Sequence, residues 1–298
     1  MGRYVERAED TARILDVHYH LLLEEGSGDA TAATSSLLRV MGVATPEDEV
    51  HGPDHALYAL AYDRSSSSSI AGAVTAAWNN ARSARPALSS ELWEAVNATF
   101  VALPQLLSEE GATTPHVLFG WVKERSAVIT GLAESTMTHD DGWHFLILGR
   151  ALERVDMTCR LLTARSIGVW GDTGWVTTLR CCSAHEAYLR TYHRAVDASL
   201  AGEFLLLDRL FPRSAFFAIT DAEQCLLELD PSESRTGLSD PARRILGRAR
   251  ATLEFAPVAL LLDEMPDRLA AIQTLCAEAA GAIADRYFRH TRPVTWSA

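Results

Sequence analysis

The chain has 298 residues, of which 48% are hydrophobic and 22% are charged, values typical of a globular protein that buries a substantial core. Its formal net charge of −12 argues against non-specific binding to the nucleic-acid backbone, which requires a dense basic surface. No apolar run approaches the ~20 residues of a membrane-spanning helix, and the polar N-terminus lacks a secretory signal. The sequence therefore predicts a soluble, cytoplasmic protein that binds neither nucleic acid nor membrane.

Helical periodicity dominates the sequence, because apolar residues recur at three- and four-residue steps in nearly every segment. The expected helices, in chain order, cover 3–24, 31–42, 54–62, 70–85, a segment from Ser89 or Ser90 to about 103, 116–136, 141–166, 173–200, 203–210, 212–229, 240–254 and 267–289. A hydroxyl of the serine run 65–69 can accept a first-turn N–H and so cap the helix that begins at Ile70. No segment alternates as a strand does, so the predicted fold class is all-α, a helical bundle.

One stretch of the sequence occurs twice. Residues 2–15 and 149–162 align without a gap, and seven of the fourteen positions are identical. A second similarity follows in the same order, because 60–69 matches 205–214 at the sequence Asp-Arg and at the serine that ends each segment. Two repeats in the same order indicate a duplicated helical unit.

The two copies are not separated by a flexible linker, because the helix expected over 116–136 leads almost directly into the second copy. We therefore expect a single helical domain over 1–298 that consists of two fused halves, at about 1–136 and 137–298. An approximate internal two-fold axis should relate these halves.

The repeated motif gathers charged side chains on one helix face. Residues three positions apart project from the same side of an α-helix, so Glu6 accompanies Glu9, and Glu153 accompanies Asp156. If the two copies meet at the two-fold axis, four carboxylates and several arginines converge on one centre. Such a centre could hold a divalent cation, grip a phosphate or carboxylate, or form a buried network in which the charges neutralise each other. Solvated Glu–Arg pairs are the remaining alternative.

Several familiar chemistries have no support in the sequence. Ferritin-like di-iron sites need Glu-x-x-His on two helices, whereas Glu9 and Asp156 stand where the histidines would be. The five cysteines contain no Cys-x-x-Cys pair, and Cys159 and Cys276 fall in apolar helical patterns, as expected of structural thiols. The chain has no P-loop and no Gly-x-Gly-x-x-Gly or Gly-x-Ser-x-Gly motif, so neither a cofactor nor a metal site is assigned.

Two further helices carry candidate residues. Near residue 190, Glu186 and Arg190 share one helix face and Tyr188 lies on another. A set of this kind can perform acid–base chemistry, and a core-facing tyrosine with surface charges is the alternative. The charged triplet at 123–125 interrupts an otherwise apolar helix, either as ligand-binding groups or as a solvated face.

Six segments spread over the chain carry a family resemblance: Gly2 to Arg13, Asn80 to Arg82, Ser90 to Asn97, Trp121 to Arg125, Gly149 to Leu162 and His185 to Tyr188. In combination they resemble the alpha-E family, a bacterial all-helical family of unknown function. The resemblance implies an intracellular protein encoded beside, or fused to, a circularly permuted ATP-grasp amide ligase, often with a transglutaminase-like protein nearby. It also implies a role in ATP-dependent amide-bond formation on a peptide or small metabolite.

The leading hypothesis is an accessory or co-catalytic helical subunit of such a ligase system. Its partners would be an ATP-grasp-type ligase or transglutaminase-like protein, a peptide or small-molecule substrate, and further copies of the chain in a homo-oligomer. The alternatives are a stand-alone metal- or anion-dependent enzyme that uses the duplicated Glu/Arg motif, and a non-catalytic scaffold. The candidate catalytic residues are Glu6, Glu153 and Glu186. The candidate ligand-binding residues are Arg3, Arg7, Arg82, Lys123, Arg125, Arg150, Arg154, Tyr188 and Arg190.

Overall fold

A computed structural model describes residues 1–25, 30–43, 51–107, 114–166, 174–231 and 236–288. Within these ranges the regular structure is helical and contains no β-strand, which confirms the predicted all-α class. None of the helices in these ranges combines the length and the apolar character that crossing a membrane requires.

The N-terminal helices are α1 (Gly2–Glu25), α2 (Ala30–Val40), α3 (Pro53–Leu57), η1 (Tyr58–Tyr62), α4 (Ile70–Ser83), η2 (Arg85–Ala87), α5 (Ser90–Leu106) and α6 (Pro115–Thr136). The C-terminal helices are α7 (Asp141–Ser166), α8 (Gly174–Cys181), α9 (His185–Tyr192), α10 (Ala198–Leu207), α11 (Ala215–Leu229), α12 (Pro241–Phe255), α13 (Val258–Asp263), α14 (Met265–Ile283) and η5 (Ala284–Phe288).

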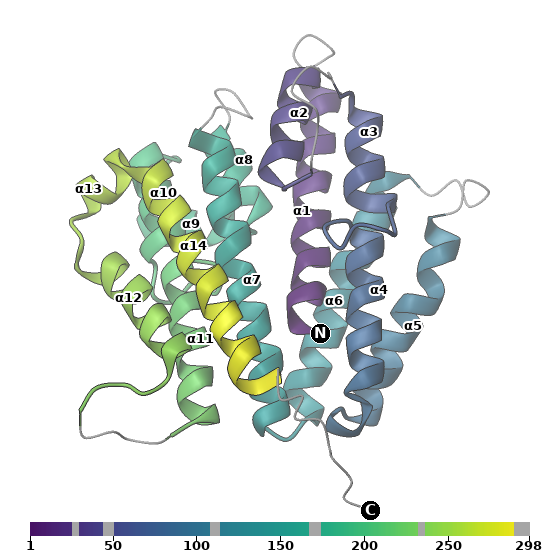
Figure 1. Cartoon of the computed structure of the whole chain (residues 1–298). Helices are drawn as coiled ribbons and strands as arrows, with labels where there is room; N and C mark the ends of the chain where they lie inside the picture. The colour runs from purple at the N-terminus through teal and green to yellow at the C-terminus, as the bar shows by residue number, and fades with distance from the viewer. Residues whose placement is uncertain (26–29, 44–50, 108–113, 167–173, 232–235, 289–298) are drawn as a thin grey trace, which may run out of the picture.

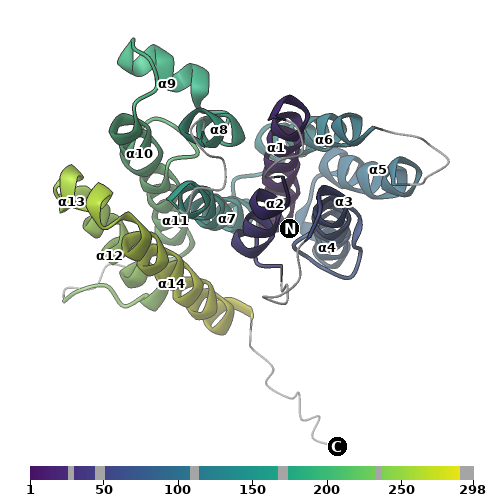
Figure 2. The same cartoon turned by 90° about the horizontal axis from the view of Figure 1, so that it is seen from above.

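Helices α1 and α7 lie side by side in the middle of the molecule (Figure 1). On one side, α1 packs against α4 and α6, and α5 packs against both of these helices. On the other side, α7 packs against α11 and α14, and α12 packs against both of these. The view from above shows the same division, with α1 to α6 on one side and α8 to α14 on the other (Figure 2). The two copies of the repeated motif therefore meet in the middle of the fold.

The apolar periodicity of the sequence accounts for the core at this contact. On α7, the predicted stripe is buried at five positions: Leu148, Leu152, Val155, Cys159 and Leu162. These residues belong to one contiguous cluster that also contains buried residues of α1, α4, α11 and α14. Burial of side chains of this size contributes about 1.5–3 kcal/mol each, which makes the α1–α7 region a major source of stability.

The predicted continuous helix over 173–200 is wrong, because the chain forms three helices there, α8, α9 and α10. Ser183 and His193 both adopt a φ of 51°, in the left-handed region that ends a right-handed helix. Asp197 then begins α10, since its carboxylate accepts the N–H of Leu200 at 3.1 Å.

Four other elements differ from the prediction. The expected helix over 54–62 is α3 followed by the π-helical turn η1, and the helix expected over 203–210 is the later part of α10. Helix α13 was not predicted from the sequence. The last expected helix is α14 with the π-helical turn η5, and residue 289 lies outside the described residues.

The predicted serine cap is confirmed, and the second repeat forms the same contact. Ser69 and Ser214 each accept the N–H three residues later, at 2.9 Å and 3.0 Å. Each hydroxyl also donates to the main-chain oxygen six residues earlier, at Asp63 and Asp208. The shared local geometry agrees with a duplicated unit, while duplication and two-fold symmetry of the whole halves stay predictions.

Candidate functional site

The glycines that begin the two motif copies allow α1 and α7 to approach each other closely. A Cβ atom on Gly2 would lie 2.0 Å from the carbonyl oxygen of Leu146, closer than any real contact. A Cβ atom on Gly149 would lie 3.3 Å from the backbone nitrogen of Arg3. The charged side chains that follow each glycine can therefore reach the opposite helix.

Glu153 of α7 accepts hydrogen bonds from two arginines of α1. Its Oε2 atom lies 3.0 Å from Nε of Arg3 and 2.9 Å from Nη2 of Arg7, and Nε of Arg7 also donates to Oε1. The Glu153 side chain is 0% exposed, whereas that of Arg3 is 44% exposed. A carboxylate with this burial requires charged partners, and the two guanidinium groups supply them.

Glu6 of α1 has the reciprocal environment. Its Oε1 atom lies 2.7 Å from Nε of Arg154 on α7 and 2.9 Å from Nη1 of Arg213. Burial alone would raise the pKa of Glu6, but the guanidinium groups of Arg213 and Arg154 outweigh it and hold that pKa below its ordinary value. The Glu-Arg pair of each motif copy therefore exchanges ion pairs with the Glu-Arg pair of the other.

Arg213 is a central member of this network that sequence reasoning missed. It lies outside both copies of the motif, between α10 and α11, yet it contacts three carboxylates of α1. These are Glu6, Glu9, which lies 2.7 Å from its Nη2, and Asp10. Although burial opposes its charge, these carboxylates raise the pKa of Arg213. The one feature of the sequence that pointed to Arg213 was its position next to Ser214, which caps α11.

Asp10 has the most unusual titration in the network. Burial, together with the neighbouring charges of Glu6 and Glu9, raises its pKa to about 7 despite the contact with Arg213. Its Oδ2 atom is buried and has no hydrogen-bond partner among the described residues. Burial therefore favours the neutral form of this carboxyl, while Arg213 opposes it.

A family model described as a predicted alpha-helical domain with a conserved ER motif matches residues 1–288. The chain belongs to the Alpha-E family. The Glu-Arg dipeptide stands in both motif copies, as Glu6-Arg7 and Glu153-Arg154. In this Alpha-E chain the dipeptides supply the ion pairs that join α1 to α7.

The curated relatives are longer proteins. The uncharacterized proteins Mb2597 of Mycobacterium bovis and MT2643 of Mycobacterium tuberculosis strain CDC 1551 are both 27% identical to the chain over 274 residues. Rv2567 of M. tuberculosis strain H37Rv, also uncharacterized, is 26% identical over the same length. Each match covers 82% of this chain and 30% of the relative, so the chain spans less than a third of the length of these relatives. No solved structure matches the chain significantly.

The outer members of the repeated motif differ between the copies. Arg150 corresponds to Arg3, but its Nε atom is buried without a hydrogen-bond partner in the described part of the chain. Burial and the nearby charge of Arg154 lower the pKa of Arg150. Asp156 corresponds to Glu9, and it pairs with Arg160 at 2.8 Å rather than with Arg213. The predicted convergence is thus seen for Glu6 and Glu9, which share Arg213, while Glu153 has Arg3 and Arg7 as its own partners.

The candidates of α9 lie away from this network. Glu186 is 85% exposed, and its Oε1 atom lies 3.8 Å from Nδ1 of His185. Arg190 is exposed. Tyr188 is buried, and its hydroxyl accepts the N–H of Asp197 at 3.0 Å and contacts the carbonyl of Ala195 at 3.3 Å. Tyr188 thereby fixes the connection to α10, in agreement with the structural alternative for this residue.

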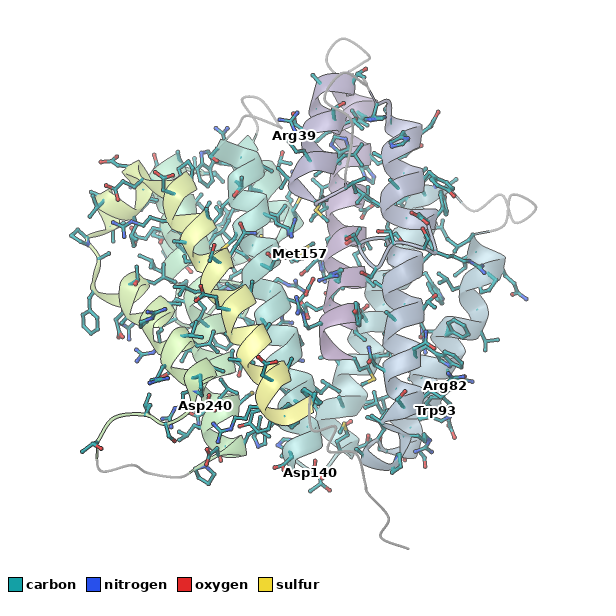
Figure 3. All side chains as sticks on the ribbon, viewed as in Figure 1. Arg39, Arg82, Trp93, Asp140, Met157 and Asp240 are labelled. Atoms are coloured by element: carbon teal, nitrogen blue, oxygen red, sulfur yellow. The ribbon has the colours of Figure 1, made fainter. Side chains whose placement is uncertain are left out.

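Arg82, Arg125 and Lys123 are also dispersed. Arg82 lies on the outer side of the α4–α5 region, with its guanidinium carbon 4.9 Å from the ring centre of Trp78 (Figure 3). Arg125 donates to the Thr99 hydroxyl at 3.1 Å and so ties α6 to α5. Lys123 is paired with a carboxylate of α1, Asp16, at 2.6 Å. These three side chains do not join the ion pairs of Glu6 and Glu153 in the described structure.

Proposed function

We propose that this Alpha-E chain is an accessory helical domain of an ATP-grasp-type ligase system, which forms an amide bond on a peptide or small metabolite at the expense of ATP. An ATP-grasp-type ligase, or a transglutaminase-like protein of the same system, would be its partner. The family resemblance supplies the reaction class. The engagement of both motif glutamates in arginine pairs carries the accessory role.

A general acid or base must exchange a proton with its substrate near neutral pH. Glu6 and Glu153 are buried, and each forms ion pairs with two arginines. The arginines also hold the pKa of Glu6 low, which opposes protonation. The same contacts occupy both carboxylate oxygens of Glu153 and Oε1 of Glu6, which a divalent cation bound there would need. These observations favour an accessory role over a stand-alone enzyme that uses the duplicated carboxylates.

The charge balance of the network supports a role in binding anions. The ion pairs join four carboxylates to five arginines: Glu6, Glu9, Asp10 and Glu153 to Arg3, Arg7, Arg13, Arg154 and Arg213. Arg150 lies beside this network, where Asp221 interacts with its charge. Guanidinium groups bind phosphate and carboxylate by paired hydrogen bonds. Arg3, which is partly exposed, could present this excess charge to an anionic substrate held by the partner.

The length of the relatives also supports an accessory role for this chain. In each of them the region similar to this chain makes up 30% of a much longer polypeptide. A helical domain that occurs within a longer chain is well placed to act beside another domain. We propose that here the helical domain and its ligase partner act together in the same way.

The proposal is tested by co-expression of the tag-free chain with an affinity-tagged ATP-grasp-type ligase encoded in the same genome. We expect the chain to co-purify with the ligase and to increase ATP-dependent amide formation, measured as ADP release and product mass. Arg3→Gln should lower product formation about tenfold while co-purification persists, since one charge-assisted contact contributes about 1.5–3 kcal/mol. Arg248→Gln, an exposed arginine of α12, is the matched control.

Two results would contradict the proposal. The first is that the chain does not associate with the ligase, whether salt or ATP is present. The second is that the product yield of the ligase is the same with and without the chain. Both results together would favour the scaffold alternative, in which the network serves stability alone.

A further inference from the structure

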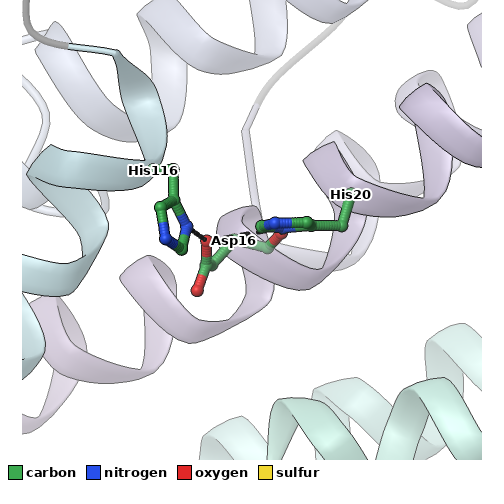
Figure 4. A group of neighbouring side chains, drawn as sticks. All are labelled: Asp16, His20 and His116. Carbon is green, nitrogen blue, oxygen red and sulfur yellow. Dashed lines mark hydrogen bonds and ion pairs between the residues drawn. The ribbon is translucent and has the colours of Figure 1, made fainter.

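A second polar cluster lies at the contact between α1 and the beginning of α6. Asp16 and His20 stand one helical turn apart on α1, and His116 is the second residue of α6 (Figure 4). One donor atom of each side chain lies within 4.8 Å of the other two. Nδ1 of His116 is 2.6 Å from Oδ1 of Asp16, and Nδ1 of His20 is 3.6 Å from the same oxygen.

We propose that Asp16, His20 and His116 form a binding site for one divalent transition-metal ion of the zinc type. Two imidazoles and one carboxylate are a donor set that zinc, cobalt and iron accept. Three protein ligands leave at least one coordination position for water or another ligand. The inference is independent of the ion-pair network and of the ligase proposal, since it uses none of their residues.

The packing prepares the three side chains for a shared ion. The ring centres of His20 and His116 are 5.1 Å apart, and the rings meet edge to face. Both imidazoles are more than half exposed, at 52% and 58%, so a metal ion can reach them from solvent. The Asp16 side chain is 13% exposed and is fixed by its neighbours. Upon binding, the ion would take the place of the hydrogen bond between His116 and Asp16, and Nδ1 of His20 would leave the main-chain oxygen of Asp16, which lies 2.7 Å from it.

Lys123 defines how the carboxylate would coordinate. Its Nζ atom holds Oδ2 of Asp16 at 2.6 Å, which leaves Oδ1 directed to the two histidines. Coordination through one oxygen, with the other bound to an outer partner, is the usual arrangement of a ligating carboxylate. The ammonium also repels a bound cation and therefore lowers its affinity.

A hollow next to the cluster provides room for a further ligand. It has a volume of about 200 Å³ and is lined by Asp16, Val17, His20, Leu21 and Arg180. The Arg180 guanidinium adds a positive charge at this place, which suits a small carboxylate or phosphate. An anion in the hollow could therefore complete the coordination of the ion.

The test uses the tag-free full chain, freed of metal by chelation and dialysis. Titration with Zn²⁺ in a calorimeter should give one ion per chain, and Co²⁺ should develop visible absorption bands of low-symmetry coordination. His116→Ala and His20→Ala should each weaken Zn²⁺ binding about tenfold or more. His139→Ala is the matched control, because His139 is exposed and stacks on Trp143 outside the cluster.

Lys123→Gln provides a second readout, since it should strengthen Zn²⁺ binding while it retains a hydrogen-bond donor for Asp16. Circular dichroism checks that each variant remains helical. If the chain binds no stoichiometric Zn²⁺ or Co²⁺, the site does not exist. Binding that is equal in the parent chain and the His20→Ala/His116→Ala double variant would also overturn the proposal, because the ion would then be held elsewhere.

Discussion

Nε of Arg154 lies 2.7 Å from Oε1 of Glu6, although the two residues are 148 positions apart in the chain. The reciprocal contact joins Arg7 of the first motif copy to Glu153 of the second. Each motif copy thus contributes one carboxylate and one guanidinium to the contact between α1 and α7. Partner exchange of this kind explains why both residues of the dipeptide occur in both copies: the loss of either one leaves a buried charge without its counterpart.

Replacement of Glu153 by glutamine should destabilise the fold by roughly 3–5 kcal/mol, because Arg3 and Arg7 would lose the buried charge that compensates them. The free energy of unfolding from urea denaturation measures the effect. Glu186→Gln is the matched control, and its exposed position predicts an unchanged denaturation midpoint. Equal stability of the two variants would show that the Glu153 pairs contribute little.

Arg213→Met should cause a loss of stability that depends on pH. The folded-state pKa of Glu6 is depressed, so its contribution is present above the unfolded pKa near 4.5 and is lost as the pH falls through the folded value. Without Arg213, the carboxylates of α1 would bind protons more readily in the folded state. The deficit of the variant should therefore be about 3–5 kcal/mol at pH 8 and smaller at pH 4.

The matched control for this pH series is Arg209→Met. Arg209 lies on the same connection but pairs with Glu254 at the surface, with most of its side chain exposed. Its replacement should cost little at any pH, as for other exposed pairs. A deficit of Arg213→Met that stays constant between pH 4 and pH 8 would refute the assigned titration.

His18 should make the protein sensitive to mild acid. Burial lowers its pKa from 6.5 to about 4, so the folded state holds the imidazole neutral. Because the folded-state pKa of His18 is depressed, the unfolded chain takes up a proton first as the pH falls. The stability that depends on neutral His18 is therefore fully present above pH 6.5 and is lost as the pH falls towards 4. The loss amounts to roughly 3 kcal/mol. His18→Gln should remove it, and a difference in unfolding free energy between parent and variant that does not change from pH 4 to pH 7 would argue against the shift.

Two helical glycines should respond to alanine in opposite directions. Gly2→Ala places a methyl group against the carbonyl oxygen of Leu146 and should cost about 1–3 kcal/mol as α1 moves away from α7. Gly131 of α6 faces open space, so Gly131→Ala should stabilise the helix by roughly 0.5–1 kcal/mol. Thermal unfolding of both variants in one buffer provides the comparison. A neutral Gly2→Ala would mean that the close approach can relax.

The helices and their buried faces were largely predictable because helical periodicity is a local property of the sequence. The stripe of α7 from Leu148 to Leu162 could be read from spacing alone. The breaks between α8 and α9 and between α9 and α10 could not, since Ser183 and His193 are neither glycine nor proline and their left-handed conformation depends on tertiary packing.

The candidate site was predictable to the extent that it lies on one helix. Spacing placed Glu6 and Glu9 on a shared face, and the repeat indicated their counterparts. Arg213 was beyond this reasoning, because it lies in a connection 203 residues after Asp10 and is brought there by packing of α11 on α7. The Asp16/His20/His116 cluster also combines a local and a tertiary feature. The spacing of Asp16 and His20 on α1 can be seen in the sequence, whereas the position of His116 depends on the contact of α1 with α6.

The distance along the chain between Asp10 and Arg213 also bears on how the protein is made. During synthesis, the carboxylates of α1 leave the ribosome long before the guanidinium that joins them, which follows 203 residues later. Until then, a nascent chain can already contain α4, α6 and α7, on which α1 packs, but it lacks the Arg213 guanidinium that pairs with these acids. Helix α1 therefore reaches its final environment only after Arg213 has been translated, and its acids must stay hydrated in the meantime.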